Sequence, residues 1–218
     1  YIQMLIKNIR RTNFFPTCTL FEINRHIVSN HTASLLPYIV QKDGNIMFAG
    51  SCLLNEGKRM EHLNSEETEI AVMLRGIRSR GMITYDIIED NKAIDQVTFE
   101  GKNRRKVKVK KDGDRYIFNI LIKLSGRLFE RKKNEPVIDH KDFIKLSQKS
   151  LEDLIRKRAE DLIIKVQEEY GFDALELGMV IKAHSREKLT KEDIDRIIQE
   201  SEINVEVKVQ IENAGGKI

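Results

Sequence analysis

Few residues of this chain have the types and spacings that catalysis or cofactor binding requires. Asp139 and His140 are adjacent in a polar stretch beside Pro136, where a carboxylate could orient an imidazole as a base. Such a pair needs a nucleophile, and no serine stands in the GxSxG frame that would present one. The glycine-rich loops that hold phosphate groups, GxGxxG and the P-loop, are also missing from the sequence. The sequence therefore predicts a protein that is not an enzyme and binds no cofactor.

The histidines, cysteines and clustered acids do not form a metal-binding pattern. His26 and His31 are five residues apart, which on a helix turns their side chains about 140 degrees from each other, so we expect surface or partly buried histidines. Cys18 and Cys52 belong to no CxxC pair, and their apolar neighbours favour two buried free thiols over a disulfide. The acidic residues at 66–69 are typical of a helix start. We expect no bound metal ion.

One segment carries a strong charge pattern. Seven of the ten residues from 102 to 111 are basic, although the formal net charge of the chain is only +4. On a strand, Lys106, Lys108 and Lys110 point to one face, where they suit anionic lipid headgroups, a partner protein or nucleic-acid phosphates. The predicted partner-facing or membrane-facing patch consists of Lys102, Arg104, Arg105, Lys106, Lys108, Lys110 and Lys111.

Two other interpretations of these basic residues were considered. A lysine-lined strand edge also prevents edge-to-edge aggregation, and the charge pattern favours this solvated, protective face over a membrane or partner contact. Nucleic-acid recognition typically requires interleaved aromatic residues or a recognition helix. The aromatic residues of the hairpin, Tyr116 and Phe118, instead belong to the alternating apolar series of its second strand. We therefore expect no nucleic acid as a partner.

Hydrophobic periodicity predicts the helices and strands on which the residues considered above lie. Strands are predicted in residues 35–61, 83–88 and 96–99, in a hairpin turning at residues 112–113, and in residues 203–211, where five aliphatics alternate toward one buried face. Helical spacing or capping residues predict helices over 17–30, from Ser65, from Ser150 to Tyr170 and after Thr190.

The order of these elements predicts an α+β fold with mostly antiparallel sheets and packed helices, because strands and helices cluster instead of alternating. The polar stretch from Asp90 to Asp95 predicts a boundary between a middle domain, residues 1–90, and a C-terminal domain, residues 91–218, with a mixed sheet and a long helix. Charged residues interrupt every apolar run short of the roughly 18 residues that a membrane-spanning helix needs. The first residues lack the cleavage site of a secretory signal, so any export signal is expected upstream.

Four segments in order resemble one known family. The run GSCLLNEGKRMEHLNSEETEIAVMLRG resembles two strands followed by an acidic helix start and a Leu-x-Gly helix end. LLPYIV resembles the family's entry into a strand, FNILIKLSGRLFE its Gly-x-Leu-x-Glu strand, and LEDLIRKRAEDLIIKVQEEYGFDALELG its long helix. The family is the Ger(x)C spore germination lipoproteins, and the matching positions are Leu36, Pro37, Gly50, Lys58, Leu63, Glu66, Leu74, Gly76, Gly126, Leu128, Glu130, Gln167, Asp173 and Gly178.

Two features depart from the family. Members usually carry a tryptophan in the last helix, where this chain has Ile194 or Ile197, and the chain contains no tryptophan. The family's first domain and its lipid-modified cysteine are also missing, and neither Cys18 nor Cys52 follows a lipobox.

The resemblance implies a non-enzymatic subunit of a nutrient germinant receptor. It implies lipid anchoring through an upstream cysteine to the outer face of the spore inner membrane, and action through contacts with the membrane-embedded A and B subunits. Two other functions compete with this one: a lipoprotein that captures a germinant in a pocket, and a nucleic-acid module that uses the basic hairpin.

Overall fold

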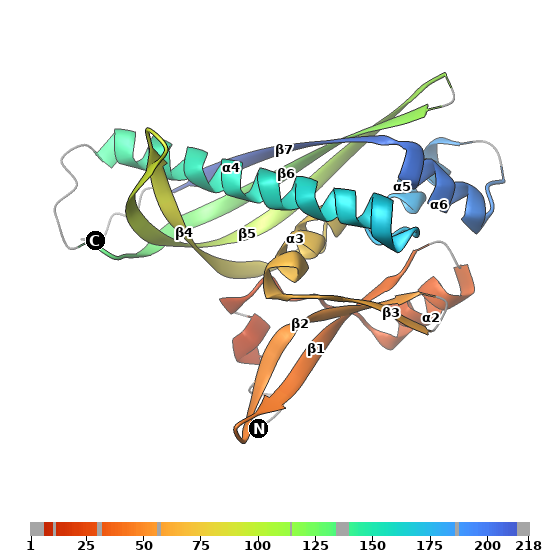
Figure 1. Cartoon of the computed structure of the whole chain (residues 1–218), viewed down its shortest axis with the longest axis horizontal. Helices are drawn as coiled ribbons and strands as arrows, with labels where there is room; N and C mark the ends of the chain where they lie inside the picture. Colours follow the sequence, from red (N-terminus) through yellow and green to blue (C-terminus); the bar gives the residue numbers. More distant parts are fainter. Residues whose placement is uncertain are drawn as a thin grey trace.

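The protein is described by a computed structural model covering residues 7–10, 12–29, 32–55, 58–113, 115–133, 140–185 and 188–212. These residues form two β-sheets with helices packed between and over them, which confirms the predicted α+β fold (Figure 1). The helices are α2 (Leu20–Ser29), α3 (Ser65–Arg75), α4 (His140–Lys165), the π-helical turn η1 (Val166–Tyr170), α5 (Gly178–His184) and α6 (Lys191–Glu200). The strands are β1 (Ser34–Lys42), β2 (Asn45–Asn55), β3 (Lys58–Leu63), β4 (Arg80–Glu89), β5 (Lys92–Asp112), β6 (Arg115–Arg131) and β7 (Glu202–Ile211).

The smaller sheet is antiparallel, with the order β1-β2-β3. Its first turn is built by Asp43 and Gly44, whose φ angles of 52° and 76° lie in the left-handed region that such a tight turn requires. Pro37 lies on the edge strand β1, where its missing N–H costs the sheet no central hydrogen bond. This sheet accounts for the strands predicted between residues 35 and 61.

The larger sheet has the order β4-β5-β6-β7. The first three strands are antiparallel, and β7 returns parallel to β6 with Glu202 beside Ile117 and Ile211 beside Gly126. The sheet is therefore mixed, and the helices α4 to α6 form the long connection that parallel pairing needs.

The boundary predicted between residues 90 and 91 lies in the tight turn that joins β4 to β5. Asp90 and Asn91 have φ angles of 47° and 61°, and the two strands pair from Glu89 and Lys92 back to Arg80 and Lys102. The polar stretch that predicted a boundary is a hairpin turn in the structure. The division into domains stays a prediction.

Helix α4 covers one face of the larger sheet (Figure 1). It begins at His140, ten residues before the expected start, so the prediction of a helix cap at Ser150 is wrong. Ser150 is buried in mid-helix, where its hydroxyl accepts a hydrogen bond of 3.0 Å from the backbone N–H of Ile88. Ser147, one turn earlier, bonds the hydroxyl of Tyr85 at 2.6 Å. These small polar residues let α4 lie close to β4.

Local capping signals fix the other helix ends. Asn64, and not Ser65, caps α3, because its side chain accepts from the N–H of Glu67 while the Glu67 carboxylate accepts from the N–H of Asn64, each at 2.9 Å. Thr190 and Asp193 form the same reciprocal pair at the start of α6, as their spacing predicts. Gly171 ends η1 in the left-handed conformation.

Helix α3 lies between the two sheets (Figure 1). It contacts β2 and β3 on one side and β5, β6 and α4 on the other. Residues 70–75 are accordingly all buried, including the charged Arg75. A helix buried on both sides joins the sheets through one continuous hydrophobic core.

Candidate functional site

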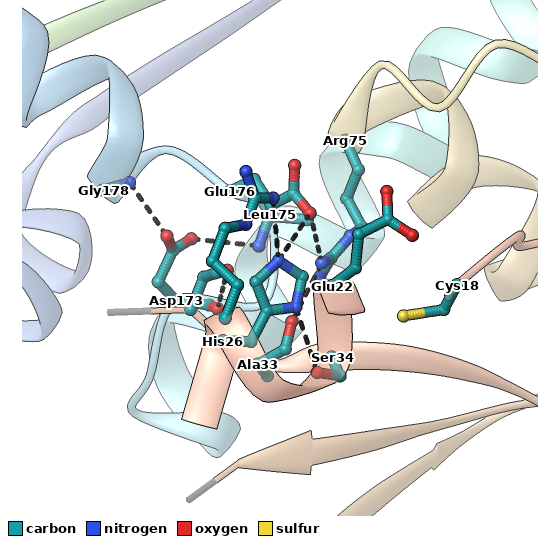
Figure 2. A network of polar contacts seen from close by, with 12 residues as sticks. Cys18, Glu22, His26, Ala33, Ser34, Arg75, Asp173, Leu175, Glu176 and Gly178 are labelled. Atoms are coloured by element: carbon teal, nitrogen blue, oxygen red, sulfur yellow. Dashed lines mark hydrogen bonds and ion pairs between the residues drawn. The ribbon is translucent and has the colours of Figure 1, made fainter. Parts of the chain in front are cut away.

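A network of buried polar groups lies where α2, β1 and α3 meet the loop before α5 (Figure 2). His26 comes from α2, Ser34 from β1 and Arg75 from the last turn of α3, and Asp173 and Glu176 come from the loop. Because these side chains come from four separate elements of the chain, only the folded protein brings them together.

Arg75 is the centre of the network. Its side chain is 1% exposed, and its guanidinium donates to the carbonyl oxygens of Ala174 at 2.8 Å and Ala33 at 2.9 Å. It also forms an ion pair of 2.6 Å with the carboxylate of Glu176. The charge on a buried guanidinium is tolerated because these acceptors replace the water that it has lost.

Asp173 shapes the loop that carries Glu176. Its carboxylate accepts from the backbone N–H groups of Leu175 at 3.1 Å, Leu177 at 3.1 Å and Gly178 at 2.8 Å. Burial nevertheless raises the pKa of Asp173 to about 6, since removal from water disfavours the charged form more than these bonds favour it. Asp173 is therefore a structural residue that holds the loop against α3.

His26 is buried in this network and does not lie at the surface. Its Nδ1 is 3.0 Å from the hydroxyl of Ser34, and its Nε2 is 3.8 Å from the carboxylate of Glu176. Burial, and next the charge of Arg75, lower the pKa of His26 below its ordinary value. The imidazole is therefore favoured in its neutral form at neutral pH. His31, the other half of the pair considered for metal binding, lies outside the described residues.

The thiol of Cys18, beside this network, is not activated as a nucleophile. Cys18 lines the same region as His26, but its thiol donates to the carbonyl of Thr19 at 3.8 Å. Burial and then Glu22 raise the pKa of the Cys18 thiol, which disfavours the reactive thiolate. Cys18 and Cys52 are both free, as expected, but they are half-buried and not fully buried as predicted.

The other residues considered for catalysis and metal binding form no site among the described residues. Asp139 lies outside them, and His140 is the first residue of α4. Within the described part of the chain, no group of three or more His, Cys, Asp or Glu side chains is arranged to hold a metal ion. No helix in that part has the length and apolar character to cross a membrane.

The seven basic residues of the predicted patch lie on β5, where alternation divides them between two faces. The solvent-exposed face opposite α4 carries Lys102, Arg104, Lys106, Lys108 and Lys110, which we call the basic stripe. Arg105 and Lys111 lie on the other face. Arg105 is half-buried and donates to the carbonyls of Leu74 and Leu175, and Lys111 lies 5.7 Å from the ring centre of Tyr116.

The basic stripe follows a free strand edge for most of its length. β4 pairs with β5 only as far as Lys102, so beyond this point β5 pairs with β6 alone. Two strands across the sheet, Glu206 on β7 lies in register with Lys106 on β5, with Leu121 of β6 between them. The exposed face is therefore basic along β5 and mixed in charge along β7.

A second uncovered surface lies on α2. Its outer side carries large apolar side chains at seven-residue spacings, which place them on one side of the helix. Leu20 is 85% exposed, Phe21 76%, Val28 75% and Ile27 42%. The inner side carries His26, which is buried against Ser34. We call these four apolar residues the α2 apolar face.

Sequence reasoning missed this surface. Leu20, Ile27 and Val28 stand at helical spacing, which predicts a helix but does not show whether its apolar side is covered. Phe21 beside Leu20 was the available signal, because two adjacent large apolar residues widen the stripe beyond what one buried side needs.

Several positions that carry the family resemblance have structural roles. A Cβ atom added at Gly50 would lie 2.0 Å from the carbonyl oxygen of Leu63, and one at Gly126 would lie 2.0 Å from that of Glu100, so neither site admits a side chain. Gln167 donates to the carbonyls of Ile198 and Ser201 at 2.8 and 2.9 Å, which joins the end of the long helix to α6. These residues maintain the fold.

Comparisons with known proteins test the family resemblance found in the sequence. A family model described as "Spore germination B3/GerAC like, C-terminal" matches residues 49–215. The solved "Crystal Structure of the GerBC protein" is similar in fold, with a TM-score of 0.76 and 18% sequence identity over 90% of this chain. This chain covers 61% of that solved chain. Comparison with curated protein sequences gives no match.

The match over residues 49–215 includes most of the chain and contains three of the four segments on which the resemblance rests. The similarity in fold extends this agreement to nine tenths of the chain. The resemblance to the Ger(x)C proteins is therefore confirmed, and the chain belongs to the spore germination B3/GerAC-like family.

Proposed function

We propose that this chain works as a non-enzymatic C-type subunit of a nutrient germinant receptor and acts by binding partner proteins at the spore inner membrane. Family membership supports a role in spore germination. The family resemblance supports the membrane-embedded A and B subunits as partners, and a lipid on an upstream cysteine as the anchor to the outer face of that membrane.

The α2 apolar face is the observation that carries the proposal. Leu20, Phe21 and Val28 are each at least three-quarters exposed on one side of a ten-residue helix. Exposed apolar side chains gathered on one element are costly in water and typical of a protein contact, and an amphipathic helix fits the groove of a partner. The buried inner side of α2 holds the helix in place for such a contact.

The test is a pull-down with the membrane-embedded A and B subunits. We expect the triple variant Leu20→Gln, Phe21→Ser, Val28→Thr to bind at least about tenfold more weakly, since burial of large apolar side chains dominates most interfaces. The fold should be retained because these side chains face solvent, and an unchanged circular dichroism spectrum and melting temperature would show this.

A matched control comes from three apolar residues exposed elsewhere. Phe129 on β6, Ile164 on α4 and Met179 on α5 are each about half exposed, at 53%, 51% and 49%. The variant Phe129→Ser, Ile164→Gln, Met179→Gln removes three large apolar side chains from other elements, although less of their surface is exposed, and it should bind normally. Equal binding by the parent and the α2 variant would show that the α2 apolar face is not part of the interface.

The basic stripe supports a second contact, with an anionic membrane surface. Its residues are exposed, and lipid anchoring would keep the protein within reach of anionic headgroups. Each basic residue near such a surface contributes about 1 kcal/mol, so a few lysines in a row are enough to orient an anchored protein. Protection of the free β5 edge against aggregation is the alternative, and vesicle binding distinguishes the two.

A further inference from the structure

We propose that the cavity on the inner side of α2 binds a small organic anion, held by the guanidinium groups of Arg25, Arg75 and Arg78. The cavity has a volume of about 340 Å³, at the lower end of the range for small-molecule sites. Its walls come from the residues before α2, from α2 itself, from the end of α3 with the residues that follow it, and from Leu35 of β1 and Glu176 of the loop before α5. The proposal does not depend on the α2 apolar face, which lies on the opposite side of the helix.

The buried wall of this cavity offers an unused hydrogen-bond donor. The Nε of Arg75 is buried without a hydrogen-bond partner among the described residues, although the two terminal nitrogens of the same guanidinium are engaged. A buried donor without an acceptor costs about 1 to 3 kcal/mol, more when it is charged. Nε has less than 1 Å² of accessible surface, so an oxyanion in the cavity would reach it only after a small shift of the groups that cover it. The charge of the anion would then strengthen the bond.

Two further arginines stand at the mouth of the cavity with donors to spare. Arg25 is exposed, and the contact found for it is one of 3.4 Å between Nη2 and the Nε2 of His26. Arg78 is also exposed and makes no hydrogen bond or ion pair within the described part of the chain. Planar guanidinium groups match the paired oxygens of carboxylates and phosphates, which makes arginine well suited to hold such ligands.

The carboxylates of the cavity do not cancel this positive charge. Glu176 is paired with Arg75, and one oxygen of Glu22 accepts from both the N–H and the hydroxyl of Thr19, at 2.7 and 2.9 Å. Three arginines against two glutamates leave one positive charge in excess in the lining. His26, with its lowered pKa, adds no charge at neutral pH. The ligand chemistry that fits is therefore a carboxylate or phosphate group on a small molecule.

Cys18 supplies a direct reporter, because its half-buried side chain lies in the wall of the cavity. Figure 2 shows it on the same side of Arg75 as Glu22. In a Cys52→Ser background, the rate at which Cys18 reacts with a thiol reagent would be measured with increasing succinate or inorganic phosphate, at constant ionic strength set with chloride. We expect one or both probes to slow the reaction saturably, and titration calorimetry to give one site per chain.

The double variant Arg25→Gln, Arg78→Gln should raise the concentration of probe needed for half-protection by about tenfold or more, because two charge-assisted hydrogen bonds are lost. Both residues are exposed, so the variant should fold like its parent. Arg115→Gln, a single exposed arginine at the tip of the β5–β6 hairpin, should leave protection unchanged.

Protection by succinate alone would assign a carboxylate ligand, protection by phosphate alone a phosphate ligand, and protection by both a general oxyanion site. The proposal is overturned if neither probe protects Cys18 saturably, or if the double variant is protected as well as its parent. The first result would mean that the cavity holds neither anion. The second would place the bound anion elsewhere on the surface.

Discussion

Arg75 and Glu176 stand 101 positions apart in the chain, and their side chains meet at 2.6 Å. Glu176 has a φ of 56°, in the left-handed region that residues other than glycine rarely adopt. This conformation turns the Glu176 carboxylate toward α3 and is held by the Asp173 loop around it. The pair joins the loop before α5 to the helix that lies between the two sheets.

Removal of this guanidinium should destabilise the whole fold. In Arg75→Met the carbonyls of Ala33 and Ala174 and the carboxylate of Glu176 lose their buried partner, and breaking a buried ion pair typically costs about 3 to 5 kcal/mol. Glu176→Gln keeps an oxygen acceptor at the same place but leaves the buried charge of Arg75 without a counter-charge, so it should also destabilise the fold, by a similar amount. Urea unfolding of the three proteins measures both losses. A loss below about 1 kcal/mol for Arg75→Met would show that the network contributes little stability.

Asp173 should make stability depend on pH in the acid range. Its pKa is raised to about 6 in the folded protein from an ordinary value of 3.8, so the folded state keeps a proton that the unfolded state loses. This contribution is complete below pH 3.8 and is lost as the pH rises to about 6, and it amounts to about 3 kcal/mol.

The comparison that isolates this effect is with Asp173→Asn, which cannot titrate. As the pH rises from about 4 to 6.5, the parent should lose stability relative to the variant by up to about 3 kcal/mol. Other carboxyl groups titrate equally in both proteins, so their effects cancel in the difference. A difference that stays constant over this range would mean that Asp173 has an ordinary pKa in the folded protein.

A charge placed on the inner face of β7 should unfold the larger sheet. Val207 is buried on β7 beside Ile122 of the central strand β6 and faces α4. In Val207→Asp an unpaired carboxylate replaces an apolar side chain there, at a cost of several kcal/mol, comparable with the stability of a small domain. Lys208→Asp, one residue on and exposed, should melt close to the parent. A Val207→Asp protein that also melts within a few degrees of the parent would contradict this packing.

The basic stripe should bind anionic vesicles. We expect Lys106→Gln, Lys108→Gln, Lys110→Gln to weaken binding by up to about 100-fold, at about 1 kcal/mol for each charge lost, while the melting temperature stays the same. Salt should weaken binding of the parent, because these charges are exposed and screened. Sedimentation with vesicles of phosphatidylserine and phosphatidylcholine measures the effect.

The control for the basic stripe removes three charges from another face. Lys145, Lys149 and Lys157 are exposed on α4, on the opposite side of the sheet, and their replacement by Gln should leave vesicle binding nearly unchanged. No binding by the parent, or equal binding by the stripe variant, would leave edge protection or a protein contact as the role of the stripe.

The sequence by itself determined the features that depend on neighbouring residues. Asp112 and Gly113 predicted the β5–β6 hairpin, and Thr190 with Asp193 predicted the start of α6, because turns and caps are made by side chains a few positions apart. Alternation along β5 also placed Lys106, Lys108 and Lys110 on one face. The order of such local features was enough to show the family resemblance and the α+β class.

Only the tertiary structure decided what those elements touch. Ser150 has the spacing of a helix cap but lies inside α4, because its hydroxyl meets the N–H of Ile88 on β4. Arg105 belongs to a basic run but turns inward to the carbonyls of Leu74 and Leu175. Arg75 is a basic residue in the last turn of α3, yet it lies at the centre of the buried network.

The difference between local features and long-range contacts also explains why the sequence did not reveal two of the sites. The α2 apolar face has the spacing of a core stripe, and only the packing around α2 leaves Leu20 and Phe21 uncovered. The cavity joins Arg25, Arg75 and Arg78 from two separate segments, and the 173–178 loop that closes the network lies about a hundred residues further along the chain. Burial and charge pairing depend on contacts between distant segments, and such contacts leave no periodic trace in one sequence.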